Sequence, residues 1–251
     1  GLKEIIGTGI SNFAGSPKNR RLNIKVGADK LNGQLIEPNE EFSLLKALGT
    51  VDGKAGYLPE LVIKGNKTTP EFGGGLCQIG TTMFRAALAT GLPITMRRNH
   101  SYRVSYYEPA GTDATIYDPA PDLKFINDTG NYILIQSRQS GDNLYFDFWG
   151  TNDGRVATQT YPVIYKIVKP GPTKIIETLD LKPGEKKCTE KAHNGADAYF
   201  DYTVNYATGE AKEKRFNSHY VPWREVCLLG VEKLSTDQSA TSTPVAAPKI
   251  Q

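Results

Sequence analysis

The stretch GGGLCQIGTTMFRAALATGLP, residues 73–93, decides how the first half of this chain is interpreted. From Cys77 onward, apolar residues recur at helical spacing, and Gly91 and Pro93 mark the end of the predicted helix. Cys77 therefore falls in the first turn, where backbone N–H groups and the positive end of the helix dipole favour a thiolate. The three glycines before it let backbone approach a ligand closely, because no Cβ intrudes. The pattern is typical of a nucleophilic cysteine, although a small buried cysteine at a tight helix entry is the alternative.

The segments on either side predict a mixture of helix and strand. Residues 16–33 read as a helix with Ser16 as N-cap, Pro17 at the first helical position and Gly33 past the end. Residues 61–64 read as a short strand, followed by a loop rich in Thr and Pro. After the helix come β-rich runs separated by Gly, Asn and Asp, namely HSYRVSYY, DATIYD, LKFIND, NYILIQSRQ and LYFDFWG. This order predicts an α+β fold in which the helix-start cysteine packs beside an antiparallel sheet.

The second half of the chain has a different character. Two Pro-Gly turns interrupt β-rich segments, and AYFDYTVNY-ATGE-AKEKRFN predicts a hairpin. A polar, aperiodic tail rich in Ser, Thr, Pro and Ala follows. We therefore expect a first domain at 1–155, a small all-β module at 156–233 and a flexible tail at 234–251.

The composition argues against a nucleic-acid-binding protein and is compatible with a protein of the cell envelope. The chain of 251 residues is 39% hydrophobic and 23% charged, with a net charge of +3, which is too mild to indicate a nucleic-acid partner. No stretch approaches the roughly 20 apolar residues of a membrane span. Gly1 reads as a processing scar, so we expect any membrane contact to come from an N-terminal anchor missing from this sequence.

Three cysteines indicate two different roles. Hairpin geometry places Cys188 and Cys227 at the open end of one hairpin, where a disulfide would close a loop of about 40 residues and stabilise the module by roughly 3–4 kcal/mol. A disulfide predicts an oxidising, extracytoplasmic location. The alternatives are two free thiols, or a zinc site completed by His193 and His219, whose spacing departs from the usual short clusters. Cys77 is left unpaired, as a reactive thiol would be.

A nucleophilic thiol needs a base, and the first domain has one histidine, His100. Cysteine, histidine and acid then follow in the order used by papain-like and transglutaminase-like enzymes. If 108–112 is a hairpin loop, His100 faces Ala120, and Asp118 and Asp122 are its diagonal neighbours. Asp113 would lie roughly 23 Å up the same ladder. Geometry therefore ranks Asp118 first.

These residues resemble the VanW-like domains of bacterial envelope proteins over roughly residues 10–150. The segments that carry the resemblance are NRRLNI, LNGQLIEPNEEFSL, GY, GGGLCQIGTTMFRAAL and NHSYRVSYYEPAGTDATIYDPAPDLKFIND. Some members of that family act as L,D-transpeptidases in peptidoglycan cross-linking. The resemblance implies Cys77 as nucleophile and His100 as base, and its acid pattern favours Asp113 and Asp122 instead of Asp118.

The predicted function is a secreted or envelope-associated cysteine acyltransferase that forms 3→3 cross-links through a thioester. Its partners would be peptidoglycan stem peptides, with wall glycans bound by the C-terminal module, where Tyr220 and Trp223 could stack on sugar. No metal or organic cofactor is expected. Candidates for substrate binding are Gly75, Gln78, Thr81, Ser101 and Tyr102, and a backbone N–H near Cys77 or the Gln78 amide would stabilise an oxyanion.

Two other functions fit the same sequence. In a non-catalytic wall-binding protein, Cys77 and His100 would be structural and the β-module would bind the wall. In a cysteine endopeptidase or amidase, the same three residues would cut stem peptides, and only the products would distinguish it from a transpeptidase.

Overall fold

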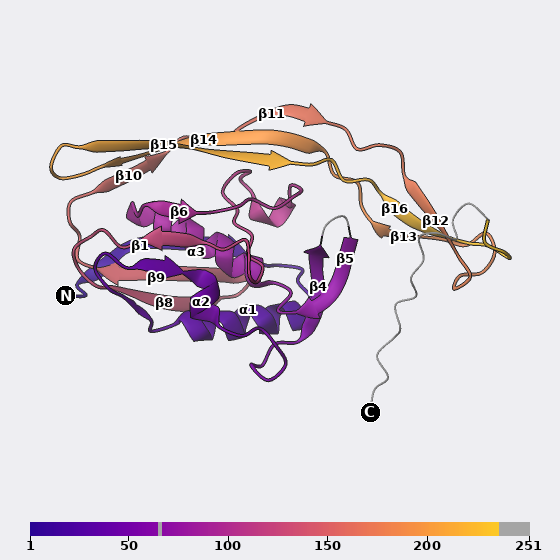
Figure 1. Ribbon diagram of the computed structural model, residues 1–251, viewed down its shortest axis with the longest axis horizontal. Coiled ribbons are helices and arrows are strands. Elements are labelled where there is room, and N and C mark those ends of the chain that lie inside the picture. Colours follow the sequence, from indigo (N-terminus) through magenta and orange to yellow (C-terminus); the bar gives the residue numbers. More distant parts are fainter. Residues whose placement is uncertain (65–66, 236–251) are drawn as a thin grey trace.

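The computed structural model describes residues 1–64 and 67–235 (Figure 1). The described part is mostly antiparallel β-sheet with few helices, and it includes one parallel strand pair. No helix within these ranges is long and apolar enough to cross a membrane. The predicted tail falls outside the described residues from 236 onward.

A four-stranded sheet and two helices form the body of the first half. Strands β1 (Glu4–Asn12), β9 (Asn143–Gly150), β8 (Ile133–Ser140) and β2 (Leu35–Ile36) lie side by side in that order. Helix α3 (Leu76–Thr90) packs on β1 and β9, and α1 (Lys18–Leu31) packs on α3 and β8. Glycines in β1 allow the close contact with α3, because a Cβ on Gly9 would lie 2.0 Å from the Thr82 carbonyl oxygen.

The hydrophobic pattern accounts for the core. In β8 and β9 alternate residues are buried, namely Ile133, Ile135, Leu144, Phe146 and Phe148. On α1 the apolar residues Ile24, Ala28 and Leu31, which lie on one face at helical spacing, are likewise buried. The strands predicted at 131–139 and 144–150 and both long helices are thus confirmed. The expected N-cap is wrong by one residue, since Pro17 precedes α1 and the Ser16 hydroxyl accepts a hydrogen bond from Arg20 instead.

Short elements complete the first half. Strand β3 (Glu41–Ser43) leads into α2 (Leu44–Leu48), and β3 pairs with β7 (Lys124–Ile126), which pairs with β6 (Ile94–Met96). The strand expected at 61–64 is part of β4 (Pro59–Lys64). Residues Lys67–Phe72 form a second strand, β5, paired with β4, so the expected loop is wrong over these residues.

Residues 97–122 differ most from expectation. The two strands predicted at 100–107 and 113–118 are absent, and the segment holds only a short 3₁₀ turn, η1 (Ser105–Tyr107). Three prolines, Pro109, Pro119 and Pro121, interrupt it. Proline has no N–H group to donate to a ladder, so a regular hairpin cannot extend through these positions. The register that placed His100 opposite Ala120 does not exist.

The C-terminal region is all-β, as predicted. The predicted hairpin is formed by β14 (Gly195–Asn205) and β15 (Ala211–Tyr220), with Asn205 opposite Ala211. Strands β10 (Val156–Gln159) and β11 (Val163–Val168) pair with β14. Beyond the hairpin, β12 (Lys174–Thr178), β16 (Val226–Gly230) and β13 (Lys186–Glu190) form a separate sheet. Cys188 of β13 faces Cys227 of β16, and they form the predicted disulfide.

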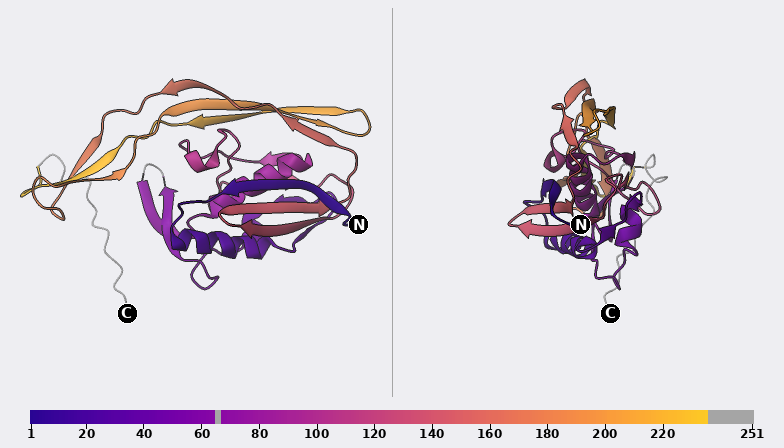
Figure 2. Two further views of the ribbon diagram at one scale, coloured as in Figure 1. Left: turned by 180° about the vertical axis from the view of Figure 1, so that it is seen from behind. Right: turned by 90° about the vertical axis from the view of Figure 1, so that its left-hand side faces the viewer.

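The hairpin lies along the first half instead of standing apart from it (Figure 2). Phe200, Tyr202, Val204 and Phe216 belong to the same hydrophobic cluster as α3 and the main sheet. The Tyr202 hydroxyl also donates a hydrogen bond to the Leu88 carbonyl of α3, at 2.7 Å. The predicted domain boundary near 155 is therefore crossed by a continuous core.

Candidate active site

Cys77 is the second residue of α3, and its side chain is partly exposed. Gly75 precedes the helix in the left-handed region, with φ of 113°, and its carbonyl accepts from the Gln78 N–H. Two of the glycines are needed for packing against the chain itself. A Cβ on Gly75 would lie 2.9 Å from Cγ of Arg20, and one on Gly74 would lie 2.7 Å from the Glu60 carbonyl oxygen. The absence of side chains on these glycines thus allows the start of α3 to pack closely against α1 and β4.

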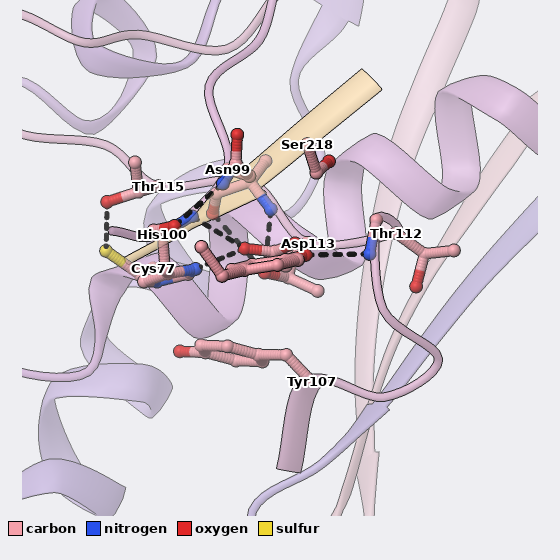
Figure 3. Close-up of polar contacts among 12 residues, drawn as sticks. Cys77, Asn99, His100, Tyr107, Thr112, Asp113, Thr115 and Ser218 are labelled. Carbon is pink, nitrogen blue, oxygen red and sulfur yellow. Dashed lines mark hydrogen bonds and ion pairs between the residues drawn. The ribbon is translucent and has the colours of Figure 1, made fainter. Parts of the chain in front are cut away.

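His100 lies beside Cys77 on the irregular segment and is 5% exposed (Figure 3). Its Nδ1 lies 2.6 Å from Oδ2 of Asp113, and the same oxygen accepts from the His100 backbone N–H at 2.7 Å. The Tyr107 ring stacks on the imidazole, with centroids 4.6 Å apart. Because the carboxylate accepts from Nδ1, Nε2 is the ring nitrogen left to exchange a proton with the thiol.

The acid beside His100 is Asp113, and the ranking that put Asp118 first is wrong. Asp118 is exposed, on the loop between the prolines. Asp122 is buried but faces elsewhere, accepting hydrogen bonds from the Ser43 hydroxyl and the Leu45 N–H at the start of α2. The error arises because the assumed hairpin is absent. The loop folds back and brings Asp113 next to His100, whereas a strand ladder would separate the two residues. The acid pattern implied by the family resemblance included Asp113.

Cys77, His100 and Asp113 shift one another's pKa values. Burial raises the pKa of the Cys77 thiol, but hydrogen bonds with His100 and Thr115 and the charge of His100 outweigh it and lower the pKa from 9.0 to about 7. Burial lowers the pKa of His100, but hydrogen bonds with Asp113 and Cys77 and their charges raise it to about 9. Burial also disfavours ionised Asp113, yet His100 and Arg97 hold its pKa well below the usual range. Between about pH 7 and 9 the geometry therefore favours a thiolate–imidazolium pair.

Thr115 is a site residue that sequence reasoning did not single out. Its hydroxyl lies 3.3 Å from Sγ of Cys77, and the thiol also lies 3.5 Å from the Ile116 carbonyl oxygen. Thr115 is the last residue of the sequence Gly-Thr-Asp-Ala-Thr, which lies in a segment that carries the family resemblance. The motif therefore pointed to this position, but the sequence did not indicate what Thr115 does. Arg97, which contacts Oδ1 of Asp113 at 3.3 Å, was missed because nothing in its sequence neighbourhood pairs it with an acid.

Two of the predicted substrate-binding side chains are fully buried. Gln78 accepts a hydrogen bond from Arg20 and donates to Ser11 and to the Asn12 carbonyl. The Thr81 hydroxyl bonds both backbone groups of Ala114, which holds the segment that carries Asp113. These side chains build the site and do not face a substrate in this conformation. The Gln78 side-chain amide, which was a predicted oxyanion donor, is used in these internal hydrogen bonds and does not face a substrate either.

The other predicted contacts are distributed around the site. Gly75 and the exposed Ser101 remain candidates for substrate contact. The Tyr102 ring packs against His193 and Trp223 of the C-terminal region. Tyr220 and Trp223 are 2% and 5% exposed, so the expectation that this pair stacks on sugar is wrong.

The zinc alternative for the C-terminal cysteines is also wrong. Cys188 and Cys227 are disulfide-bonded, His219 pairs with Asp197, and His193 packs on Tyr102. Within the described ranges, the potential metal-binding group is Cys188, Glu225 and Cys227. A disulfide offers no thiolate, so these residues do not form a zinc site of the usual kind.

The profile of the family described as "VanW like protein" matches residues 19–149, a segment that includes all three residues of this cluster. The chain belongs to this family. The resemblance inferred from the sequence motifs is thereby confirmed.

Two relatives show how far the similarity extends. The uncharacterized protein YoaR of Bacillus subtilis (strain 168) is 31% identical over 147 residues, which are 59% of this chain and 48% of YoaR. The vancomycin B-type resistance protein VanW of Enterococcus faecalis (strain ATCC 700802 / V583) is 37% identical over 117 residues, 45% of this chain and 42% of that protein. The chain thus aligns with about half the length of each relative.

Proposed function

We propose that this protein is a peptidoglycan L,D-transpeptidase that uses Cys77 as its nucleophile. The observation that carries the chemistry is the partly exposed thiol beside a histidine whose Nδ1 is held by a buried carboxylate. The reaction class and the substrate are those that the sequence resemblance to VanW-like domains implies, and membership of this family supports an association with the cell wall.

The first half-reaction forms a thioester. The Cys77 thiolate attacks the carbonyl that links the third residue of a stem tetrapeptide to its terminal D-Ala, forming a C–S bond. His100, protonated in the resting pair, gives its proton to the leaving nitrogen as the C–N bond breaks, and D-Ala departs as an amine. Asp113 holds the imidazole and stabilises its charge, and the Thr115 hydroxyl lies where it can donate to the sulfur or the developing oxyanion.

The second half-reaction forms the cross-link. The side-chain amine of a second stem peptide attacks the thioester carbonyl, His100 takes the amine proton, and the C–S bond breaks to regenerate the thiolate. Water in place of the amine gives a carboxypeptidase. The disulfide in the C-terminal region supports a location outside the cytoplasm, where the substrate is found.

The test is mass spectrometry of a purified tetrapeptide muropeptide incubated with the protein, with Cys77→Ala and with Asp118→Asn as a control. Loss of one D-Ala together with a new cross-linked dimer, present in the protein and in Asp118→Asn but absent in Cys77→Ala, supports transpeptidation. Loss of D-Ala without a dimer identifies a carboxypeptidase, and cleavage elsewhere in the stem an endopeptidase or amidase. Binding without any reaction leaves a wall-binding protein and contradicts the proposal.

A further inference from the structure

The segment that carries His100 contacts the C-terminal β-region through three residues close to the histidine, one before it and two after it. The Asn99 side-chain amide donates to the His219 carbonyl at 2.8 Å. The Val221 N–H donates to the Ser101 carbonyl at 2.7 Å. The Tyr102 ring then packs on the Trp223 ring, with centroids 4.7 Å apart. The end of β15 and the residues after it therefore contact the chain on both sides of the candidate catalytic histidine.

A fourth contact reaches the acid itself. The Tyr220 hydroxyl donates to Oδ1 of Asp113 at 2.6 Å and accepts from the Gly111 N–H at 2.7 Å. Tyr220 is the last residue of β15 and is 2% exposed, so its side chain is shielded from bulk solvent. Arg97 adds a second link, since its guanidinium contacts the Ser218 hydroxyl at 2.9 Å and Oδ1 of Asp113 at 3.3 Å.

The two oxygens of Asp113 are thus used for different purposes. Oδ2 accepts from both the imidazole and the backbone N–H of His100. Oδ1 is held by Tyr220 at 2.6 Å and, at a longer distance, by Arg97. A carboxylate held through one oxygen can rotate about its Cβ–Cγ bond, because the torsion angle of this terminal bond has only a weak preference. Contacts on the second oxygen fix the rotation and so keep Oδ2 aimed at Nδ1.

We infer that Tyr220, from the C-terminal β-region, is a positioning residue that orients Asp113 and through it His100. The inference rests on the proposed function, because the residues it positions are the proposed catalytic ones. Tyr220 lies outside residues 19–149, the segment matched by the family profile. The chemistry of this chain then depends on a region that the family match does not include.

Other charged and titratable groups around the site come from α1, η1 and α3, and the interactions given for them below do not involve Tyr220. Arg20 of α1 faces Tyr106 and Tyr107, and both tyrosines face Cys77. Arg85 of α3 faces Asp113 and Glu108. Because these groups stay in place, a change in thiol titration on removing the Tyr220 hydroxyl reports on Asp113 and His100.

The experiment compares Tyr220→Phe with Tyr202→Phe in the full chain. Tyr202 is a matched control, because it is also buried, lies on the paired strand β14 and donates its hydroxyl to a carbonyl away from the site. The rate of Cys77 alkylation by iodoacetamide is measured against pH, with the free thiol of Cys77 as the reacting group. We expect Tyr220→Phe to move the midpoint upward by about half a pKa unit to one unit, and so to lower the thiolate fraction at pH 6 by about threefold to tenfold. Tyr202→Phe should leave the midpoint in place.

A double variant separates positioning from general destabilisation. In an Asp113→Asn background, Tyr220→Phe should add no further shift, because the group that it orients is gone. The Nδ1 proton resonance of His100 should move upfield in Tyr220→Phe and remain in Tyr202→Phe, as the hydrogen bond to Asp113 weakens.

Three results would overturn the inference. An unchanged midpoint would mean that Arg97 alone orients the carboxylate. A downward shift would mean that the Tyr220 hydroxyl only screens the charge of Asp113. An equal shift with and without Asp113 would mean that Tyr220 acts by another route. None of these readouts uses peptidoglycan, so failure of the muropeptide assay with an intact Tyr220 effect would reject the transpeptidase and keep the positioning role.

Discussion

The segment 97–122 and the β14–β15 hairpin lie against each other and are held in shape by different forces. The hairpin is fixed by an unbroken ladder in which ten residue pairs face one another, from Ala196–Tyr220 to Asn205–Ala211. The segment 97–122 has almost no regular structure, and charged side chains pin its backbone. Arg97 donates to the Gly111 and Asp113 carbonyls, and Arg85 donates to the Tyr107 and Thr112 carbonyls.

The comparison shows why the reactive residues lie on the irregular segment. A ladder would place residues 100 and 113 on opposite strands at a separation set by the register. A loop pinned by guanidinium groups can instead fold back so that one carboxylate contacts both the ring and the backbone of His100. The cost is that the geometry depends on individual side chains, so single substitutions there should alter chemistry more than stability.

The largest effect is expected at the acid. Asp113→Asn should lower the rate of D-Ala release by about a thousandfold, because an amide neither stabilises the imidazolium nor selects the tautomer. Asp118→Asn, on the exposed part of the same loop, should leave the rate within about twofold. Rates from the muropeptide assay at pH 7.5 measure both. Equal losses in the two variants would restore Asp118 as a candidate acid.

The hairpin should respond in the opposite way. Phe200 is fully buried and stacks on Phe216 at 5.1 Å, inside the core shared with α3. Phe200→Ala should lower the free energy of unfolding by about 3–5 kcal/mol through lost burial and a cavity. Denaturant unfolding followed by fluorescence should remain one transition, because the core is continuous. Two separate transitions would show that residues 156–233 fold independently.

The far end of the module tests whether stability and chemistry can be separated. Replacing Cys188 and Cys227 together by serine should lower the unfolding free energy by about 3–4 kcal/mol, as the constraint on the unfolded chain is lost. The alkylation midpoint of Cys77 should stay near pH 7, because neither cysteine contacts the site. A shifted midpoint would mean that the distal sheet influences the loop.

The smallest effect concerns the base. Without the charge and hydrogen bond of His100, the Cys77 pKa should return from about 7 toward 9, since both factors lower it. At pH 7 about fiftyfold less thiolate would be present, partly offset by the greater nucleophilicity of a more basic thiolate, so His100→Ala should slow alkylation by about fivefold to tenfold. The profile of the unaltered protein should rise with pH through about 7. A profile that rises only near 9 in both proteins would contradict the ion pair.

Much of the architecture could be predicted from local pattern. Helical spacing from Cys77 to Leu88 and the Gly91 C-cap defined α3, because burial on one face leaves a period that the sequence displays. Alternation in the same way defined β8, β9 and the β14–β15 hairpin. The Cys188–Cys227 disulfide followed from the same hairpin geometry, although the two cysteines lie on β13 and β16.

The sequence by itself determined the chemical components: an unpaired cysteine at a helix start, one nearby histidine and a choice of acids. Only the tertiary structure decided which acid meets His100, because that contact depends on a proline-interrupted loop whose path is set by Arg85, Arg97 and Tyr220. Each of these side chains acts on a residue at least 14 positions away in the chain. Arg97 and Arg85 bind carbonyl groups of the loop backbone, and Tyr220 binds a carboxylate. Periodicity reports which face of an element is buried, and it carries no information about such long-range hydrogen bonds.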